Sequence, residues 1–335
     1  MNLAVPAPHA VIEAVGEDGA CLRVRRHGVA SGPRLLISHG NGFGIDGYFP
    51  FWTRFLAAFD VAVFDMRSHG QNPQADPANH NYAHMTRDLD AICRAVRDEF
   101  GRKPTAGLFH SMSAQCAMLQ ALAGNSEFAA LVLFDPPNVP RSGHAVRVKM
   151  AEYEHKLAHW ARHRRDHFDD PLALANEYAS TRSGQRWAAG IAELMARAVL
   201  QPGPAGGWAL ACPKELEASM YLQGIPLGLW PKRGQFVMPV TLIGADPDTP
   251  YPAATGLSNR ALAAEGGFNY AAIPGTSHLL QLEEPEACAD AALDFVGQIR
   301  FRQAKISVSL RGAERRSNLP RIGRDWREIA SLRSQ

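Results

Sequence analysis

Three residues whose types could together activate a hydroxyl group each follow a short apolar run of this chain. Ser111 stands between an apolar run and a helix-forming run, Asp246 follows a later apolar run, and His278 lies in a Gly-Thr-Ser-His segment. A serine hydroxyl is a weak nucleophile until a histidine accepts its proton and a carboxylate orients that histidine. Because serine, acid and histidine in this order is a known triad order, we predict that Ser111, Asp246 and His278 form a catalytic triad.

Each role has a rival. Ser113 also lies in the turn, but the helix-forming run begins at about Met112 to Ser113, which leaves Ser111 at the apex and favours it. Asp248, in Asp-Pro-Asp, is the alternative acid, and Asp135 ends an earlier apolar run from which a carboxylate could also reach the histidine.

A glycine-rich segment could supply the second part of such a site. His39-Gly-Asn-Gly42 follows an apolar run, and glycines there let a backbone N–H point into the site. The N–H groups of Asn41 and Met112 would then bind the oxyanion of a tetrahedral intermediate. The letters Gly42-Phe-Gly-Ile-Asp-Gly47 also match a dinucleotide fingerprint, but that interpretation leaves the three triad candidates unexplained.

The elements that must position these residues alternate between apolar runs and helical stretches. Continuous apolar runs separated by helices are typical of parallel strands buried on both faces, and ligands bind at the carboxyl ends of such strands. A hairpin at residues 11–24 precedes them. The predicted strands are Arg34–His39, Val61–Asp65, Ala106–Phe109, Leu131–Asp135, Val240–Gly244 and Tyr270–Pro274, and the predicted helices between and after them are Tyr48–Ala58, Met85–Phe100, Ala114–Ala123 and Pro285–Phe301.

Two regions depart from this alternation. Residues 138–235 are too long for a loop and are helical in pattern, which predicts a helical cap inserted into a core formed by residues 1–137 and 236–303. The four helices predicted in the cap are Ala145–His163, Leu172–Thr181, Gly184–Leu200 and Pro213–Tyr221. Residues 304–335 form a basic tail with few apolar residues, which predicts a surface segment. With one aromatic residue, Trp326, the tail does not favour nucleic-acid binding.

Composition narrows the class of protein. The 335 residues have a net charge of +2, which indicates no particular partner. Five scattered cysteines without a CxxC pair fit reduced thiols in the cytoplasm better than disulfides or a zinc site, so we expect a cytoplasmic protein without a metal. No run of 18 or more apolar residues occurs, so we expect no membrane span.

Taken together, the chain resembles the α/β-hydrolase superfamily over about residues 10–300. The matching pieces are His39-Gly-Asn-Gly, Asp65-Met-Arg-Ser-His-Gly70, His110-Ser-Met, Gly244-Ala-Asp-Pro and Gly275-Thr-Ser-His. The resemblance implies a mostly parallel eight-stranded sheet with helices on both faces, an inserted helical cap, a Ser-Asp-His triad and no cofactor. Phe109 departs from the family pattern, which has a small residue there, and could displace the serine.

The resemblance implies a serine hydrolase that cleaves a small-molecule carboxylic ester through an acyl-enzyme. We expect an apolar acyl group, in a pocket lined by Phe43, Tyr48, Trp52 and His110. Two alternatives stay open: a lyase or cofactor-free oxygenase on the same scaffold, and a non-catalytic small-molecule binding protein. A homodimer is also left open.

Overall fold

The computed structural model describes residues 3–204 and 206–297 and contains the predicted eight-stranded sheet. The strand order is β1-β2-β4-β3-β5-β6-β10-β11. β1 and β2 form the predicted antiparallel hairpin, β2 pairs antiparallel with β4, and the strands from β4 to β11 are parallel. The bounds are β1 Ala10–Val15, β2 Cys21–Gly28, β3 Arg34–Ser38, β4 Asp60–Phe64, β5 Thr105–His110, β6 Ala130–Phe134, β10 Val240–Ala245 and β11 Asn269–Ile273.

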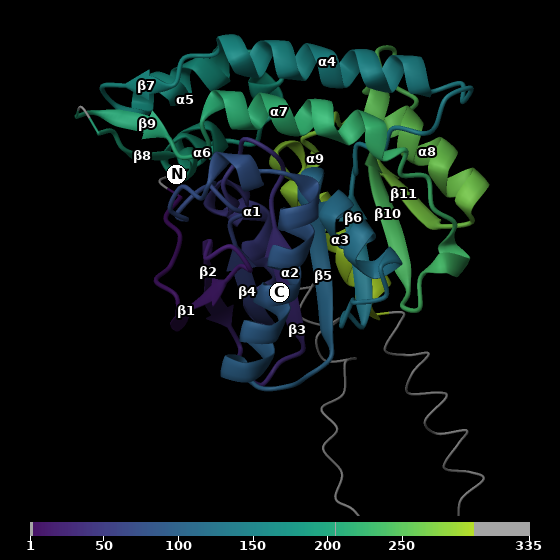
Figure 1. The fold of residues 1–335 in the computed structure, drawn as a ribbon, viewed down its shortest axis with the longest axis horizontal. Coiled ribbons are helices and arrows are strands. Elements are labelled where there is room, and N and C mark those ends of the chain that lie inside the picture. The colour runs from purple at the N-terminus through teal and green to yellow at the C-terminus, as the bar shows by residue number, and fades with distance from the viewer. Residues whose placement is uncertain (1–2, 205, 298–335) are drawn as a thin grey trace, which may run out of the picture. The chain divides into compact units, whose positions relative to one another are not determined.

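Helices cover both faces of the sheet (Figure 1). Leu133 of β6 joins an apolar cluster that includes α2 (Tyr82–Phe100) and α3 (Met112–Leu122). The next residue, Phe134, packs edge-on against Phe51 of the short helix α1 (Phe49–Trp52) at 5.2 Å. Because neighbouring side chains of a strand point to opposite faces, α1 lies across the sheet from α2 and α3.

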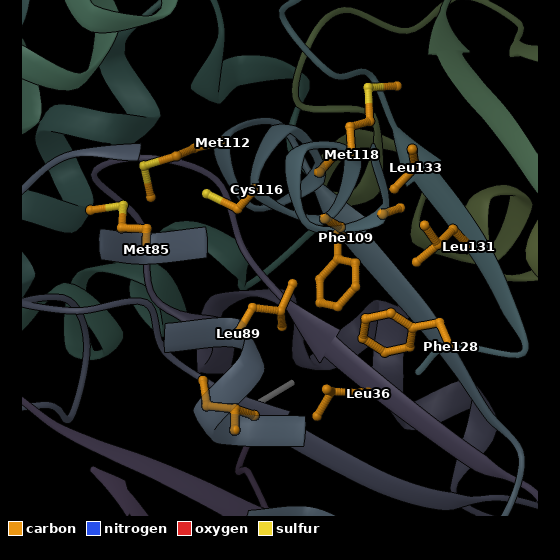
Figure 2. Packing of buried hydrophobic residues seen from close by; sticks show 14 of the residues in the cluster. Leu36, Met85, Leu89, Phe109, Met112, Cys116, Met118, Phe128, Leu131 and Leu133 are labelled. Carbon is orange, nitrogen blue, oxygen red and sulfur yellow. The ribbon is translucent and has the colours of Figure 1, made fainter. Parts of the chain in front are cut away.

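The central strand accommodates Phe109 because Gly107 precedes it by two residues on the same face. The Phe109 ring is fully buried and lies beside Phe128 and Leu36 (Figure 2), with ring centroids 5.5 Å apart for the two phenylalanines. A Cβ atom on Gly107 would lie 2.4 Å from Cε2 of Phe109. The large Phe109 side chain therefore packs in the apolar core that also contains residues of α3.

The insertion (residues 138–235) contains the four predicted helices and one feature that the sequence did not predict. Its helices are α4 (Arg147–His163), α5 (Pro171–Ser180), α6 (Ile191–Val199) and α7 (Lys214–Gly224), and α4 packs along α7 (Figure 1). A small sheet in the order β7-β9-β8 joins them, formed by His167–Phe168, Trp208–Leu210 and Leu200–Pro202. Strands of two or three residues are too short to produce a recognisable periodicity.

Other predicted elements differ in detail. The helix expected at Tyr48–Ala58 is broken into a 3-10 turn (Ile45–Tyr48), α1 and a second 3-10 turn (Thr53–Phe55). α8 (Ala254–Gly266) and the short α9 (Leu280–Glu283) precede a helix that covers residues 285–297. The predicted end of that last helix at Phe301 and the basic tail lie outside the described residues. The boundaries between core and cap stay a prediction.

No helix among the described residues is long and apolar enough to cross a membrane.

Candidate active site

Ser111 occupies the sharp turn between β5 and α3. Its backbone has φ 54° and ψ −117°, an unusual conformation for a residue with a side chain. Its N–H donates to the carbonyl of Phe134 at 2.9 Å, which holds the turn against the end of β6. Ser113 is already in the helix, and its hydroxyl donates to the carbonyl of His110 at 2.9 Å. Ser111 is therefore the serine at the apex of the turn.

Ser111, His278 and Asp135 form a chain of two hydrogen bonds. The distance from Ser111 Oγ to His278 Nε2 is 2.9 Å, and that from His278 Nδ1 to Asp135 Oδ2 is 2.7 Å. Asp135 is fully buried, and its Oδ1 accepts from Ala245 N–H at 3.0 Å and from Asn259 Nδ2 at 2.9 Å. Such a carboxylate favours the tautomer in which Nδ1 carries the proton and Nε2 is free to accept one from the serine.

The expected contact between Asp246 and His278 is wrong. Asp246 accepts two backbone hydrogen bonds instead, from Gly275 N–H at 2.7 Å and from Asp248 N–H at 2.8 Å, and these bonds lower the pKa of its carboxyl group. Asp246 therefore braces the loop that carries the histidine. Asp248 is exposed and pairs with Arg260 at 2.6 Å, so it does not reach the histidine either.

The sequence contained a signal for this arrangement. Asp246 is followed by Pro247 and Asp248, a pattern typical of an aspartate that bonds the backbone N–H two residues ahead. Asp135 ends an entirely apolar strand directly beside β5, the strand that leads to Ser111. The strand that leads to Asp135 is thus a neighbour of the strand that leads to the serine, whereas the carboxylate of Asp246 is used to bond its own turn. Asp135 is therefore the better partner for the histidine.

The glycine-rich segment lies against the serine. A Cβ atom on Gly40 would stand 3.1 Å from Ser111 Cβ and 2.9 Å from His110 Nδ1, so only glycine allows this approach. Within the described ranges, the N–H groups of Asn41 and Met112 have no hydrogen-bond acceptor. The Asn41 side chain points elsewhere and donates to the carbonyl of Glu217 in the insertion at 2.8 Å. One of these donors, on Met112, directly follows Ser111 in sequence, and the other, on Asn41, directly follows Gly40, which lies against Ser111.

A hydrogen-bond chain that we did not predict ties three loops together. Gly40 N–H lies 3.4 Å from the Tyr48 hydroxyl, which lies 2.8 Å from His110 Nδ1. His110 Nε2 lies 2.9 Å from the backbone carbonyl of His278. Burial lowers the pKa of His110 well below its usual value, and the nearby His278 lowers it further. A neutral His110 can donate from Nε2 and accept the tyrosine proton at Nδ1.

The Asp65-Met-Arg-Ser-His-Gly70 segment braces the same glycine-rich loop. Gly42 N–H donates to His69 Nε2 at 3.1 Å, and Met66 N–H donates to His39 Nε2 at 3.0 Å. Burial lowers the pKa of His39 to about 4 and that of His69 to about 3, so both rings are neutral acceptors. Asp65 Oδ1 accepts from Ile45 N–H at 2.7 Å, just beyond the loop.

The four residues expected to line a pocket differ in their burial and in their contacts. Trp52 is fully buried, packs on Phe49 at 4.7 Å between ring centroids, and donates from Nε1 to the carbonyl of Ile45 at 3.0 Å. It is a core residue, which corrects the prediction. Tyr48 and His110 are also buried and act as struts in the chain above. Phe43 is half-buried and meets Trp187 of the insertion at 6.2 Å, so its place in a pocket stays a prediction.

Comparison with known proteins identifies the family. Residues 35–291 match the family model described as "Alpha/beta hydrolase family", and the chain belongs to that family. Lipase LipV of Mycobacterium tuberculosis is 30% identical over 118 residues, which are 34% of this chain and 41% of that protein. The match thus spans less than half the length of this curated relative.

Solved structures agree on the fold. The crystal structure of E-2-(acetamidomethylene)succinate hydrolase has a TM-score of 0.69 at 19% identity, covering 86% of this chain and 100% of that one. A thermophilic esterase from Thermogutta terrifontis has a TM-score of 0.61 at 18% identity, covering 87% of this chain and 99% of that one. At these identities the solved structures show the fold alone, and that fold agrees with the family match.

Proposed function

We propose that this protein hydrolyses a carboxylic ester through a covalent acyl-enzyme on Ser111. The observation that carries the proposal is the chain from Ser111 Oγ through His278 to Asp135, with hydrogen bonds of 2.9 and 2.7 Å. This is the arrangement that a serine nucleophile requires: a base within reach of its proton, and an acid that orients the base. The lipase relative and the esterase neighbour support an ester as the bond that is cleaved.

In this mechanism Ser111 Oγ attacks the ester carbonyl carbon while His278 Nε2 accepts the hydroxyl proton. The oxyanion that forms accepts hydrogen bonds from the backbone N–H groups of Asn41 and Met112. His278 then gives the proton to the leaving alcohol, and the acyl group stays on Ser111. A water molecule, deprotonated by His278, then attacks the acyl carbon. The bond from that carbon to Ser111 Oγ breaks, His278 returns the proton to the serine oxygen, and the carboxylic acid leaves. Asp135 stabilises the imidazolium ion in both steps.

The test is turnover of p-nitrophenyl esters of increasing acyl length, followed by mass spectrometry of the intact protein. We expect turnover by the unmodified protein and a transient mass increase equal to the acyl group. Ser111→Ala should abolish both, and the control Ser113→Ala should keep Ser111-dependent acylation. Full ester turnover by a folded Ser111→Ala variant would contradict the proposal. A folded protein that turns over no ester would favour the lyase or binding alternatives.

A further inference from the structure

Glu217 of the insertion helix α7 lies on the glycine-rich loop beside Ser111. The Asn41 side chain donates from Nδ2 to the backbone carbonyl of Glu217 at 2.8 Å. A Cβ atom on Gly42 would stand 2.4 Å from Oε1 of Glu217, so the carboxylate lies directly against the next residue of the loop. The insertion therefore contacts the loop at the residue whose N–H is a candidate donor to the oxyanion.

The loop forms a tight turn that leaves the Asn41 N–H without a bond inside the turn. Phe43 N–H donates to the carbonyl of Gly40 at 3.3 Å, and Gly42 has φ 75°. A glycine with positive φ at the third position is typical of a type II turn, in which the carbonyl of the first residue bonds the N–H of the fourth. Asn41 is the second residue of this turn, so its N–H is available to an oxyanion.

Groups of the core hold the turn on both sides of Asn41 but not Asn41 itself. Gly40 N–H lies 3.4 Å from the Tyr48 hydroxyl, and Gly42 N–H donates to His69 Nε2 at 3.1 Å. The Asn41 Oδ1 atom is buried and has no hydrogen-bond partner among the described residues. The bond to Glu217 is therefore the hydrogen bond that orients the Asn41 side chain.

Glu217 is itself held by groups from several helices of the insertion. Arg164, which follows α4, donates to Glu217 Oε2 at 3.0 Å and to the Tyr178 hydroxyl of α5 at 3.0 Å. Tyr221 of α7 donates to Glu217 Oε1 at 3.4 Å. The side chains of Arg164 and Glu217 are only 7% and 2% exposed. A buried ion pair contributes little to stability compared with apolar residues, but it can specify one arrangement of the elements that it joins.

We propose that Glu217 and the Asn41 side chain are positioning residues, which fix the Asn41 backbone N–H relative to Ser111 according to where the insertion helices lie. In this role they act on the transition state more than on substrate binding, because the oxyanion forms only after attack by the serine. A donor that is displaced by as little as about 1 Å loses much of its effect on the rate. The inference rests on the proposed function, because it concerns the oxyanion of that reaction.

The test compares trifluoromethyl hexyl ketone with methyl hexyl ketone as inhibitors of p-nitrophenyl butyrate hydrolysis. Ser111 Oγ adds to the activated carbonyl carbon of the fluorinated ketone, its proton passes to His278, and the carbonyl oxygen becomes an oxyanion. The methyl ketone has the same chain and a carbonyl that is far less prone to this addition. The ratio of the two inhibition constants therefore measures how well the site binds an oxyanion, and kcat and KM are measured beside it.

The variants are Asn41→Ala, Asn41→Asp and Glu217→Gln. The matched control is Gln223→Ala, because Gln223 also lies on α7 and donates from its side-chain amide to the backbone carbonyl of His80 in the core at 3.2 Å. The control thus removes the same kind of bond between α7 and the core, at a residue outside the glycine-rich loop.

We expect the unmodified protein to bind the fluorinated ketone about 100-fold or more tightly than the methyl ketone. Asn41→Ala should lower this ratio and kcat by about 10–100-fold with little change in KM. Asn41→Asp should lose more, because its carboxylate repels both the Glu217 carbonyl and the oxyanion. Glu217→Gln should give a smaller loss, and adding it to Asn41→Ala should lower the ratio no further. Gln223→Ala should keep the ratio.

An unchanged ratio in folded Asn41→Ala, or an equal fall in Gln223→Ala, would overturn the inference. If the Asn41 variants did not fold, an unchanged ratio in Glu217→Gln would overturn it in the same way. Equal binding of the two ketones by the unmodified protein would instead contradict the proposed function, and the inference would fall with it.

Discussion

The polar groups at the carboxyl edge of the sheet differ in kind from those at the contact between core and insertion. At the sheet edge, each heteroatom that links Ser111, His278 and Asp135 has a partner within 3.0 Å. At the contact with the insertion, Oε1 of Glu154 and both ring nitrogens of His80 are buried and have no hydrogen-bond partner among the described residues. Polar groups that are paired hold a fixed geometry. Buried polar groups without a partner reduce stability unless another group pairs with them. The first region holds the candidate catalytic groups, and the second holds unpaired polar groups that reduce the stability of the fold.

The largest effect is expected from changing the aspartate that orients His278. Asp135→Asn keeps the shape but favours the wrong tautomer of His278, and we expect kcat to fall by about 10,000-fold. Asp246→Asn removes only a loop brace, so kcat should change by no more than about tenfold, the scale of one lost hydrogen bond. Steady-state kinetics on an ester that the unmodified protein turns over would measure both. The opposite ranking would restore Asp246 as the triad acid.

Acid should destabilise the region with unpaired groups. Burial, followed by the electrostatic effects of nearby groups such as the Arg67 guanidinium, lowers the pKa of His80 to about 3. Below pH 6.5 the unfolded chain binds a proton at this histidine that the folded chain does not, so stability is lost as the pH falls. His80→Phe removes that proton. At pH 4.5 the variant should lose about 2–3 kcal/mol less than the unmodified protein, relative to pH 7.5.

Urea unfolding at the two pH values would measure this difference. The Ser111→Ala background serves as a control, because it should leave the pH dependence of stability unchanged. Equal acid sensitivity with and without His80 would mean that its ring is protonated in the folded protein.

The core behind the serine can be tested separately from its chemistry. Gly107→Ala would place a methyl group 2.4 Å from the Phe109 ring, and overpacking of this kind destabilises a fold by about 1–3 kcal/mol. Thermal unfolding would measure the loss. In a Phe109→Leu background the same substitution should cost less, because the shorter side chain leaves room. If Gly107→Ala lowered the stability equally with phenylalanine and with leucine at position 109, the added methyl group would be in contact with a residue other than Phe109.

The smallest effect is expected from the strut that joins the loops. Tyr48→Phe removes the hydroxyl between Gly40 and His110 and leaves His110 Nδ1 without a donor. We expect kcat to fall by about 5–10-fold, the equivalent of one hydrogen bond, with little change in KM. Tyr270→Phe is the control, because it removes a hydroxyl that has no hydrogen-bond partner among the described residues. A change in KM alone would mean that Tyr48 contacts the substrate.

Sequence reasoning predicted the architecture because apolar runs and helical periodicity record burial directly. The six parallel strands, the hairpin and the four insertion helices follow from those patterns. The contact of Ser111 with His278 followed from strand ends that meet at one edge of the sheet. The partner of His278 was not predicted, because Asp135, Asp246 and Asp248 all follow strands, and the turn pattern at Asp246-Pro-Asp248, which argues against Asp246, was not used to choose between them.

Two further features were also beyond the sequence. Trp52 was expected in a pocket because aromatic residues suit both pockets and cores, and only its packing against Phe49 decides between them. Glu154 attracted no prediction, since a single glutamate in a helix is usually exposed and its burial depends on where α4 docks. The local pattern of a sequence does not predict contacts between residues that are far apart in the chain.

The central claim is that Ser111 is the activated serine, and labelling with a fluorophosphonate probe tests it most directly. The labelled protein would be digested and the modified peptide sequenced by mass spectrometry. We predict one adduct, on Ser111, which disappears in Ser111→Ala, is strongly reduced in Asp135→Asn and persists in Asp246→Asn. A folded protein that stays unlabelled, or that carries the adduct on Ser113, would contradict the account.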